Sequence, residues 1–264
     1  MRGPVGWFLW PRLSGLVWTV CYRHLVVFKK NWKSNLMFNF VEPLLYLAAM
    51  GYGLGSYVRN LEGWSYLQFV APGLVASSAM WATAAECTYD SFVRLHYQKV
   101  YEAIMATPVS VEELIAAEMV YGAFKSVLYG SVIILVLLAL KLVLSPWVLL
   151  VPVVLALAGL IFAELSMIWT SFAPRIETFN YFFTLVITPM FLFGGVFFPA
   201  EGLPALVRSL SWFTPLYHSA TLVRALVLGT VNATALWTHL LWLAVVAGLL
   251  FNPPVRLMRS RLVK

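Results

Sequence analysis

Apolar residues fall in long runs along this chain, and the short segments between the runs hold most of the charges. An α-helix needs roughly 20 apolar residues to cross about 30 Å of hydrocarbon, and six runs approach that length. The six runs are residues 36–57, 66–87, 118–140, 147–171, 179–198 and 234–251. This pattern predicts an all-α polytopic membrane protein, in which residues 1–264 form a single transmembrane domain with six transmembrane helices.

Residues 12–33 also place apolar side chains at helical spacing, but basic residues interrupt them. The apolar face consists of Leu13, Leu16, Val17, Val20 and Val27. An amphipathic helix of this kind lies in the membrane interface rather than across the bilayer. We therefore expect residues 1–35 to form a cytosolic segment with an interfacial helix. The alternative is a seventh span, which Arg23 and His24 in its middle disfavour.

Residues 193–224 are apolar, but glycine and proline divide them into pieces too short to cross a bilayer. An unbroken helix would have to contain Pro199, Pro204 and Pro215, each of which removes a backbone donor and clashes with the preceding turn. Broken helices at membrane depth are tolerated only where protein or a water-filled cavity surrounds them. We expect residues 199–231 to form a re-entrant helical hairpin between spans five and six, which is typical of a transporter or channel.

The charges orient the predicted helices. Only 11% of residues are charged and 61% are hydrophobic, while the net charge is +7. Lysine and arginine gather in the N-terminal segment, in the 88–117 loop and at the C-terminus, as cytosolic segments of membrane proteins do. Both termini and the 88–117 loop are therefore predicted to be cytosolic, and the 199–231 segment faces outward. Orientation in the membrane explains the basic residues better than nucleic-acid binding does.

The cytosolic loop 88–117 contains a second predicted helix, over residues 93–106, which ends before Pro108. Ser110 and Glu113 then match a capping box that begins the next helix. A short helix held on the cytosolic face suits docking to a soluble partner. A helix lying on lipid is an equally good interpretation of the same periodicity.

The motifs of several enzyme classes are absent from the sequence. It has no G-x-x-x-x-G-K-[ST], H-E-x-x-H or G-x-S-x-G, and its histidines are scattered. Cys21 and Cys87 are isolated, which supports neither a disulfide framework nor a zinc site. We expect no catalytic residue, no cofactor and no metal in this chain, so any energy source lies on another one.

Four ionisable residues lie in or at the ends of the predicted spans: Glu42, Glu86, Lys125 and Glu164. A charge at the centre of a membrane helix costs about 2.5–3.5 kcal/mol on insertion scales. In the predicted orientation all four lie toward the cytosolic ends. We hypothesise a cytosolic-side charge cluster in which Lys125 compensates one or more carboxylates. The alternative is that each side chain extends independently to the headgroups.

The arrangement and its motifs resemble the permease subunits of type-2 ABC exporters. The matching residues are Glu42-Pro43-Leu44, Ala71-Pro72-Gly73, Tyr101-Glu102, Thr107-Pro108-Val109-Ser110, Gly194-Gly195-Val196-Phe197-Phe198-Pro199, Leu203-Pro204 and Thr214-Pro215-Leu216-Tyr217-His218. Within that family the chain is most similar to the NodJ-type permeases, which export nodulation factor with a NodI-type ATPase. The implied cargo is a lipo-chitooligosaccharide, an acylated oligomer of N-acetylglucosamine.

The resemblance also implies partners and site residues. The partners are a second permease copy, membrane lipid of a bacterial inner membrane, and ATPase subunits that bind ATP and magnesium. The implied ATPase-coupling residues are Lys99, Tyr101, Glu102, Ile104, Thr107 and Pro108. The implied outer gate consists of Gly194, Gly195, Pro199, Pro204, Pro215, His218 and Arg224.

Three other functions remain open at the level of the sequence. A permease of the same kind could export a drug or antibiotic instead of an acylated sugar. An intramembrane enzyme acting on lipid-linked sugar would need a polar cleft, for which the outer segment offers Glu201, Arg208, His218 and Arg224. A passive structural or channel subunit would show no dependence on nucleotide.

Overall fold

The computed structural model describes residues 11, 13–58, 60–61 and 63–263, without the side chains of residues 34–40 and 52. Within those ranges the regular structure is helical, apart from one isolated bridge between Leu61 and Trp64. Four stretches are long and apolar enough to cross a membrane: Val111–Ala139, Pro146–Phe172, Ile176–Phe193 and Ala233–Leu262. The predicted all-α fold with several membrane-span candidates is confirmed.

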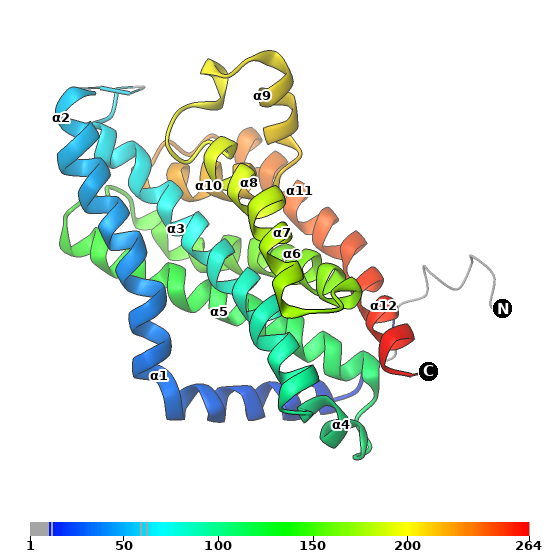
Figure 1. The fold of residues 1–264 in the computed structure, drawn as a ribbon. Helices are drawn as coiled ribbons and strands as arrows, with labels where there is room; N and C mark the ends of the chain where they lie inside the picture. The colour runs from blue at the N-terminus through cyan, green and yellow to red at the C-terminus, as the bar shows by residue number, and fades with distance from the viewer. Residues whose placement is uncertain (1–10, 12, 59, 62, 264) are drawn as a thin grey trace.

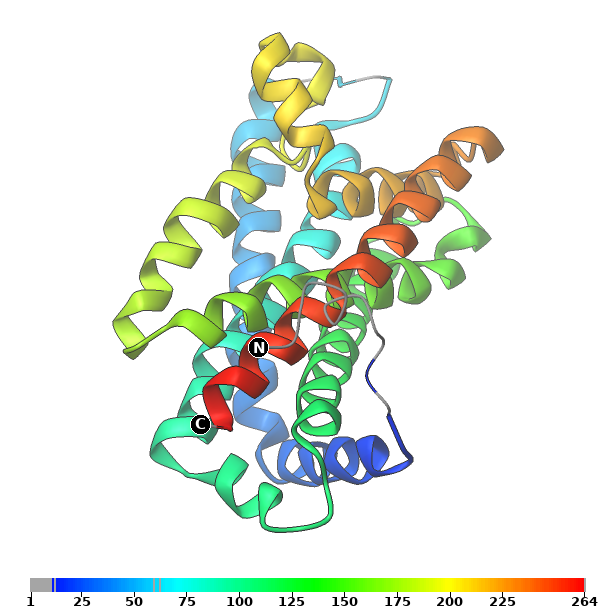
Figure 2. The ribbon, with the colours of Figure 1, turned by 90° about the vertical axis from the view of Figure 1, so that its right-hand side faces the viewer.

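The α-helices are α1 (Leu16–Ala48), α2 (Gly55–Tyr57), α3 (Tyr66–Ala85), α4 (Val100–Met105), α5 (Val111–Ala139), α6 (Val151–Phe172), α7 (Phe179–Phe182), α8 (Thr188–Phe193), α9 (Ala205–Trp212), α10 (Pro215–Leu228), α11 (Ala233–Leu250) and α12 (Asn252–Leu262). π-helical turns occupy Ala49–Leu54, Glu86–Asp90, Val93–Tyr97 and Phe183–Ile187, and 3₁₀ turns occupy Pro146–Leu150, Ile176–Thr178 and Ala200–Gly202. Helix α4 lies at one end of the bundle and α9 at the other (Figures 1 and 2).

Helix α1 bends sharply near its middle. Asn31 has φ −115° and ψ 16°, which breaks the helical path. The first half of α1 lies across the α4 end of the bundle, and the second half runs up its side (Figure 1). The sequence distinguished an amphipathic helix over residues 12–33 from the apolar run that follows, and the bend falls at that boundary.

The core forms where α5 packs between α3 and α6. The largest fully buried aliphatic and aromatic side chains of this region include Phe69, Leu114, Leu137, Leu155 and Phe162. Small residues bring the backbones of α5 and α6 close together: a Cβ added at Gly159 would lie 2.4 Å from the Ser126 Cβ and 3.1 Å from the Ala123 Cα. Ser126 donates a hydrogen bond to the Leu155 carbonyl across the same contact, at 2.7 Å.

Replacing Gly159 with alanine is therefore expected to destabilise the protein. The added methyl group overlaps atoms of α5, and overpacking of this kind costs roughly 1–3 kcal/mol. Gly248→Ala in α11 is the matched control, because a Cβ there meets no atom within 4 Å. Equilibrium unfolding of both variants in detergent measures the difference. An equal stability of the two variants would contradict the close approach of α5 and α6.

The single helix expected over residues 93–106 is wrong. Helical turns continue from α3 as far as Tyr97, and a separate helix, α4, follows. Lys99 between them has φ 54° and ψ 27°, a left-handed conformation that reverses the chain and that only a minority of non-glycine residues adopt. The predicted capping box is confirmed, since Ser110 and Glu113 exchange hydrogen bonds at the start of α5.

The predicted interruption of residues 193–224 by glycine and proline is also confirmed. Helix α8 ends at Gly194, and Gly195 has φ 74°, which favours glycine. Pro204 directly precedes α9, and Pro215 occupies the first turn of α10, where its missing N–H costs nothing. The helical part of the 179–198 run is therefore shorter than the run itself.

Candidate functional site

Charged side chains from three helical segments meet in the interior near the α4 end of the bundle. We call these the charge network: His24 of α1, Glu86 and Arg94 after α3, and Glu118 and Lys125 of α5. Arg94 bridges the two carboxylates, with its Nη1 2.7 Å from Glu86 Oε1 and its Nη2 2.6 Å from Glu118 Oε2. Lys125 pairs with the other oxygen of Glu86.

The network is buried at its centre. The side chains of Glu86 and Glu118 are 2% and 0% exposed, and that of Arg94 is 13% exposed. His24 Nε2 lies 3.2 Å from Glu118 Oε1. At the edge, the half-exposed Asp90 has its Oδ2 3.6 Å from Lys125 Nζ. A buried carboxylate that is ionised requires such partners because an unpaired buried charge is strongly destabilising.

The network joins segments that are far apart in the sequence. It holds the first half of α1, the extension of α3 and the start of α5 to one another. A cavity of about 180 Å³ opens beside it, lined by Arg23 and Gln98 as well as by network residues. Since a buried salt-bridged network has few alternative arrangements, we expect these three segments to move together.

The structure brings together only two of the four charges grouped by the sequence. Glu86 and Lys125 form an ion pair. Glu42 is exposed and lines a small groove with Tyr46 and Trp81. Glu164 is fully buried in α6, and none of the described residues gives either of its oxygens a hydrogen bond.

Sequence reasoning missed Glu118, Arg94 and His24. Glu118 precedes Lys125 by seven residues, which is two helical turns and places both on one face of a helix. That spacing was a usable signal. Arg94 follows Glu86 by eight residues, but the two share a face only because helical turns continue beyond α3, which the expected loop boundary concealed.

Further polar contacts attach both ends of the described chain to the same region. The backbone N–H of Ser14 donates to Glu113 Oε1 at 3.0 Å. Arg259 of α12 pairs with Glu112 on the surface of α5. Arg261 donates to the Ala173 carbonyl at 2.7 Å and contacts His96 Nε2 at 2.7 Å. Partial burial, followed by the nearby charge of Arg261, lowers the pKa of the His96 imidazole.

The six residues implied in ATPase coupling differ in exposure. Lys99, Glu102, Thr107 and Pro108 are exposed, and Ile104 is half-buried. Tyr101 is 0% exposed, and its hydroxyl lies 2.6 Å from Ser91 Oγ. Burial raises the pKa of the Tyr101 phenol well above its ordinary value. Tyr101 therefore anchors α4 to the bundle and does not lie on the surface that a partner would contact.

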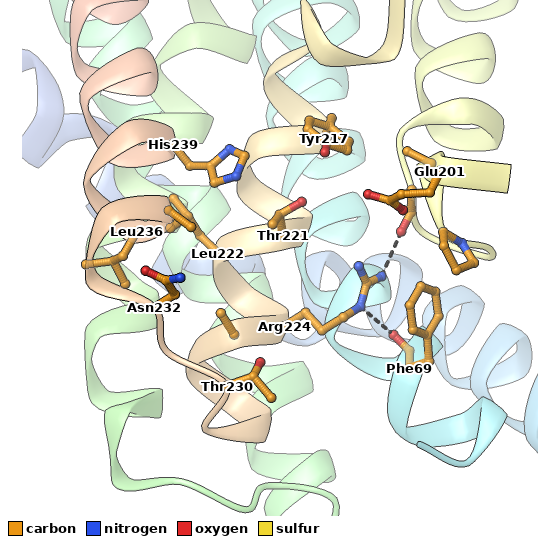
Figure 3. Close-up of a pocket in the computed structure, with 15 residues that line it drawn as sticks. Phe69, Glu201, Tyr217, Thr221, Leu222, Arg224, Thr230, Asn232, Leu236 and His239 are labelled. Carbon is orange, nitrogen blue, oxygen red and sulfur yellow. Dashed lines mark hydrogen bonds between the residues drawn. The ribbon is translucent and has the colours of Figure 1, made fainter. Parts of the chain in front are cut away.

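A cavity of about 220 Å³ with a mixed polar and apolar lining lies toward the α9 end. We call it the Arg224 pocket, and its polar lining residues include Glu201, Tyr217, Thr221, Arg224, Asn232 and His239 (Figure 3). Arg224 Nε donates to the Phe69 carbonyl at 3.1 Å, and its Nη2 donates to the Gly195 carbonyl at 2.7 Å. Its guanidinium also lies 3.8 Å over the Phe69 ring.

The residues of the implied outer gate fall around this cavity and the break before it. Gly195, Pro199 and Arg224 line the Arg224 pocket. Gly194 ends α8, while Pro204 and Pro215 lie at the starts of α9 and α10. His218 is fully buried on α10 and contacts the pocket residue His239, with 2.7 Å between their Nδ1 atoms.

Aromatic side chains gather between α1, α3 and the α7–α8 segment. The rings of Trp81 and Phe183 stack with centroids 5.4 Å apart, and Tyr46 meets Phe191 edge to face at 5.6 Å. These rings pack on one another.

In the part of the chain that the structure describes, no group of three or more His, Cys, Asp or Glu residues is placed to hold a metal ion.

Comparison with known proteins identifies the family of this arrangement. Residues 15–228 match the family described as ABC-2 type transporter. Nodulation protein J of Rhizobium meliloti (strain 1021) is 37% identical over 220 residues, which cover 82% of this chain and 83% of that protein. Nodulation protein J of Rhizobium leguminosarum bv. viciae is 34% identical over 95% of this chain and 97% of its own length.

A transport protein from a different bacterium also matches. The inner membrane transport permease YadH of Escherichia coli (strain K12) is 26% identical over 192 residues, which cover 72% of this chain and 74% of that protein. The family match spans most of the chain and includes α1, α3, α5, α6 and α10. This chain belongs to the ABC-2 type transporter family.

Proposed function

We propose that this permease moves an acylated or lipid-linked oligosaccharide, of the lipo-chitooligosaccharide class, outward across a bacterial inner membrane. The observation that carries the cargo is the similarity to nodulation protein J, which extends over 82–95% of the chain in the two relatives described above. The family supports a transport role, and YadH supports the inner membrane as the location.

The proposed energy source is a separate ABC ATPase of the NodI type, which binds ATP and magnesium. The chain has no P-loop motif of its own. Helix α4 lies at one end of the bundle, with Glu102 exposed on it and Lys99 exposed directly before it. We assign this surface to the ATPase, with movement transmitted through Tyr101 and the charge network.

The proposed topology has six spans with both termini cytosolic. In it α9 and α10 form the re-entrant hairpin that gates the outer side. The location of α9 at the end opposite α4 supports this assignment (Figure 2). Membrane lipid then surrounds the exposed apolar side chains of α11, such as Trp237 and Leu241.

A second permease copy completes the proposed pathway. The groove lined by Glu42, Tyr46 and Trp81 is open on the surface of a single chain. Exposed apolar side chains flank it on α1 and α8, including Leu45 and Leu192. A homodimer packed on these helices would cover that surface.

An export assay in cells separates this cargo from the drug or antibiotic alternative. Cells that lack the gene, but keep the partner ATPase, are expected to retain acylated chitooligosaccharide and to recover its secretion when the gene is restored. Susceptibility to hydrophobic drugs is measured in the same strains. Restored drug resistance without restored secretion would favour the alternative cargo and contradict the proposal.

A further inference from the structure

The Arg224 pocket contains an arginine that the fold already uses. The Arg224 guanidinium donates to the carbonyls of Phe69 and Gly195 and stacks on the Phe69 ring. These contacts hold the start of α3 and the turn after α8 against α10. The acidic residue Glu201 lines the same cavity. Because the Arg224 guanidinium is committed to these contacts and an acid shares the cavity, the pocket does not favour an anion.

Other polar groups on the pocket keep hydrogen-bonding capacity that the described fold does not use. Among the hydrogen bonds within the described residues, none involves the Glu201 carboxylate or the hydroxyl groups of Thr221 and Thr230. Asn232 Oδ1 accepts from the Thr234 N–H at 3.0 Å and so caps α11. Its amide nitrogen keeps two donors. Figure 3 shows Thr221, Asn232 and His239 around one space.

The hydrogen bonds of His218 determine which nitrogen of His239 carries the proton. His218 Nε2 lies 2.6 Å from the Trp212 carbonyl, which only accepts, so Nε2 is the protonated nitrogen. A buried neutral imidazole then accepts at Nδ1. His239 Nδ1, 2.7 Å away, must therefore donate. His239 Nε2 is left as an acceptor on a residue that lines the pocket.

Apart from the Glu201 carboxylate, these groups are uncharged and mix donors with acceptors. Thr221 and Thr230 do both, Asn232 donates, and His239 accepts. Each hydroxyl of a sugar likewise donates and accepts, so a sugar can satisfy such a set, whereas an acyl chain would bury it unsatisfied. The cavity, at about 220 Å³, is smaller than the roughly 300–1,000 Å³ of sites for drug-sized ligands. It suits a single ring.

We propose that the Arg224 pocket binds one sugar residue of the oligosaccharide on the outer side of the permease. This inference rests on the proposed function, because it takes the cargo to be a glycan. Thr221, Asn232 and His239 hydrogen-bond the ring. Arg224 is a positioning residue, since its contacts to Phe69 and Gly195 set the wall of the pocket.

Binding of chitotetraose, the unacylated tetramer of N-acetylglucosamine, tests the site. The purified full chain in lipid nanodiscs is titrated by calorimetry. Thr221→Val keeps the side-chain shape but loses the hydroxyl, and is expected to weaken binding by about 2- to 10-fold, the range for one net hydrogen bond. Asn232→Ser keeps an N-cap but loses the amide donors, and is expected to act similarly.

Two control variants test whether the loss of binding is specific to the missing polar groups. Thr221→Ser retains the hydroxyl and is expected to bind more tightly than Thr221→Val. Glu177→Gln changes an exposed acid outside the pocket and is also expected to leave binding unchanged. Thermal unfolding confirms that all variants are folded. Equal affinity of Thr221→Val, Asn232→Ser and the wild type, or no binding by the wild type, would overturn the site.

Export in cells distinguishes failure of the site from failure of the function. Secretion of acylated chitooligosaccharide by a permease that does not bind chitotetraose would overturn the site and leave the proposed function standing. Binding of chitotetraose without any secretion would support the pocket as a saccharide site and overturn the proposed cargo.

Discussion

Replacement of Arg94 with leucine is expected to lower the free energy of unfolding by about 3–5 kcal/mol, the range for removal of one partner from a buried ion pair. Arg94 is the residue that contacts both Glu86 and Glu118, whose side chains are almost entirely buried. Leucine fills much of the same space, but it leaves the two carboxylates close together without the positive charge of Arg94 between them. The cost is therefore electrostatic and not a matter of packing.

Arg259→Leu is the matched control for Arg94→Leu. Arg259 also pairs with a glutamate of α5, Glu112, but its side chain is 58% exposed. Exposed pairs contribute about 1 kcal/mol or less. Equilibrium unfolding in detergent compares the two variants, and a double-mutant cycle of Arg94→Leu with Glu118→Gln measures the coupling. A small, equal effect of both arginine variants would show that the charge network does not hold α1, α3 and α5 together.

The paired substitution Glu102→Arg with Ile104→Glu is expected to abolish ATP-driven export and the co-purification of the ATPase. A hot-spot residue of a protein interface costs about 2 kcal/mol or more when it is lost, which corresponds to roughly 30-fold in affinity. Glu102 is exposed on α4, and Ile104 is half-buried, with one side packed against the core around α5. Unchanged thermal unfolding of the permease verifies that the fold is intact.

Arg208→Glu controls for the reversal of charge, because Arg208 is exposed on α9 at the opposite end of the bundle. The control is expected to bind the ATPase as the wild type does. Tyr101→Phe tests the anchoring of α4 to the bundle separately from contact with the ATPase. It removes only the buried hydroxyl that lies next to Ser91 Oγ. Retention of the ATPase by the α4 variant would contradict the assigned docking surface.

The fold was largely predictable because membrane helices follow simple rules of length and polarity. The apolar runs located the long helices, Pro204 and Pro215 located the breaks, and Ser110 with Glu113 located the start of α5. The left-handed Lys99 was not predictable, because glycine and asparagine are the usual residues for that conformation. A lysine there gives no sequence signal.

The charge network was predicted only in part, because some of its ion pairs depend on tertiary packing that the sequence does not reveal. Lys125 was recognised as a charge needing a partner, and Glu86 is that partner. The pairing of Arg94 with Glu118 depends on how α3 continues past its last turn, which is decided by tertiary packing. The Arg224 pocket likewise draws residues from α10, α11 and the 3₁₀ turn before α9, and no spacing within one segment reveals it.

Transport in a reconstituted system tests the central claim most directly. The permease and its ATPase are placed in vesicles with α4 facing outward, and the accumulation of labelled lipo-chitooligosaccharide inside the vesicles is measured with and without ATP and magnesium. We predict accumulation that requires ATP, the ATPase and an intact α4 surface. Accumulation that is independent of ATP, or none at all when the ATPase is bound and hydrolysing ATP, would contradict the account.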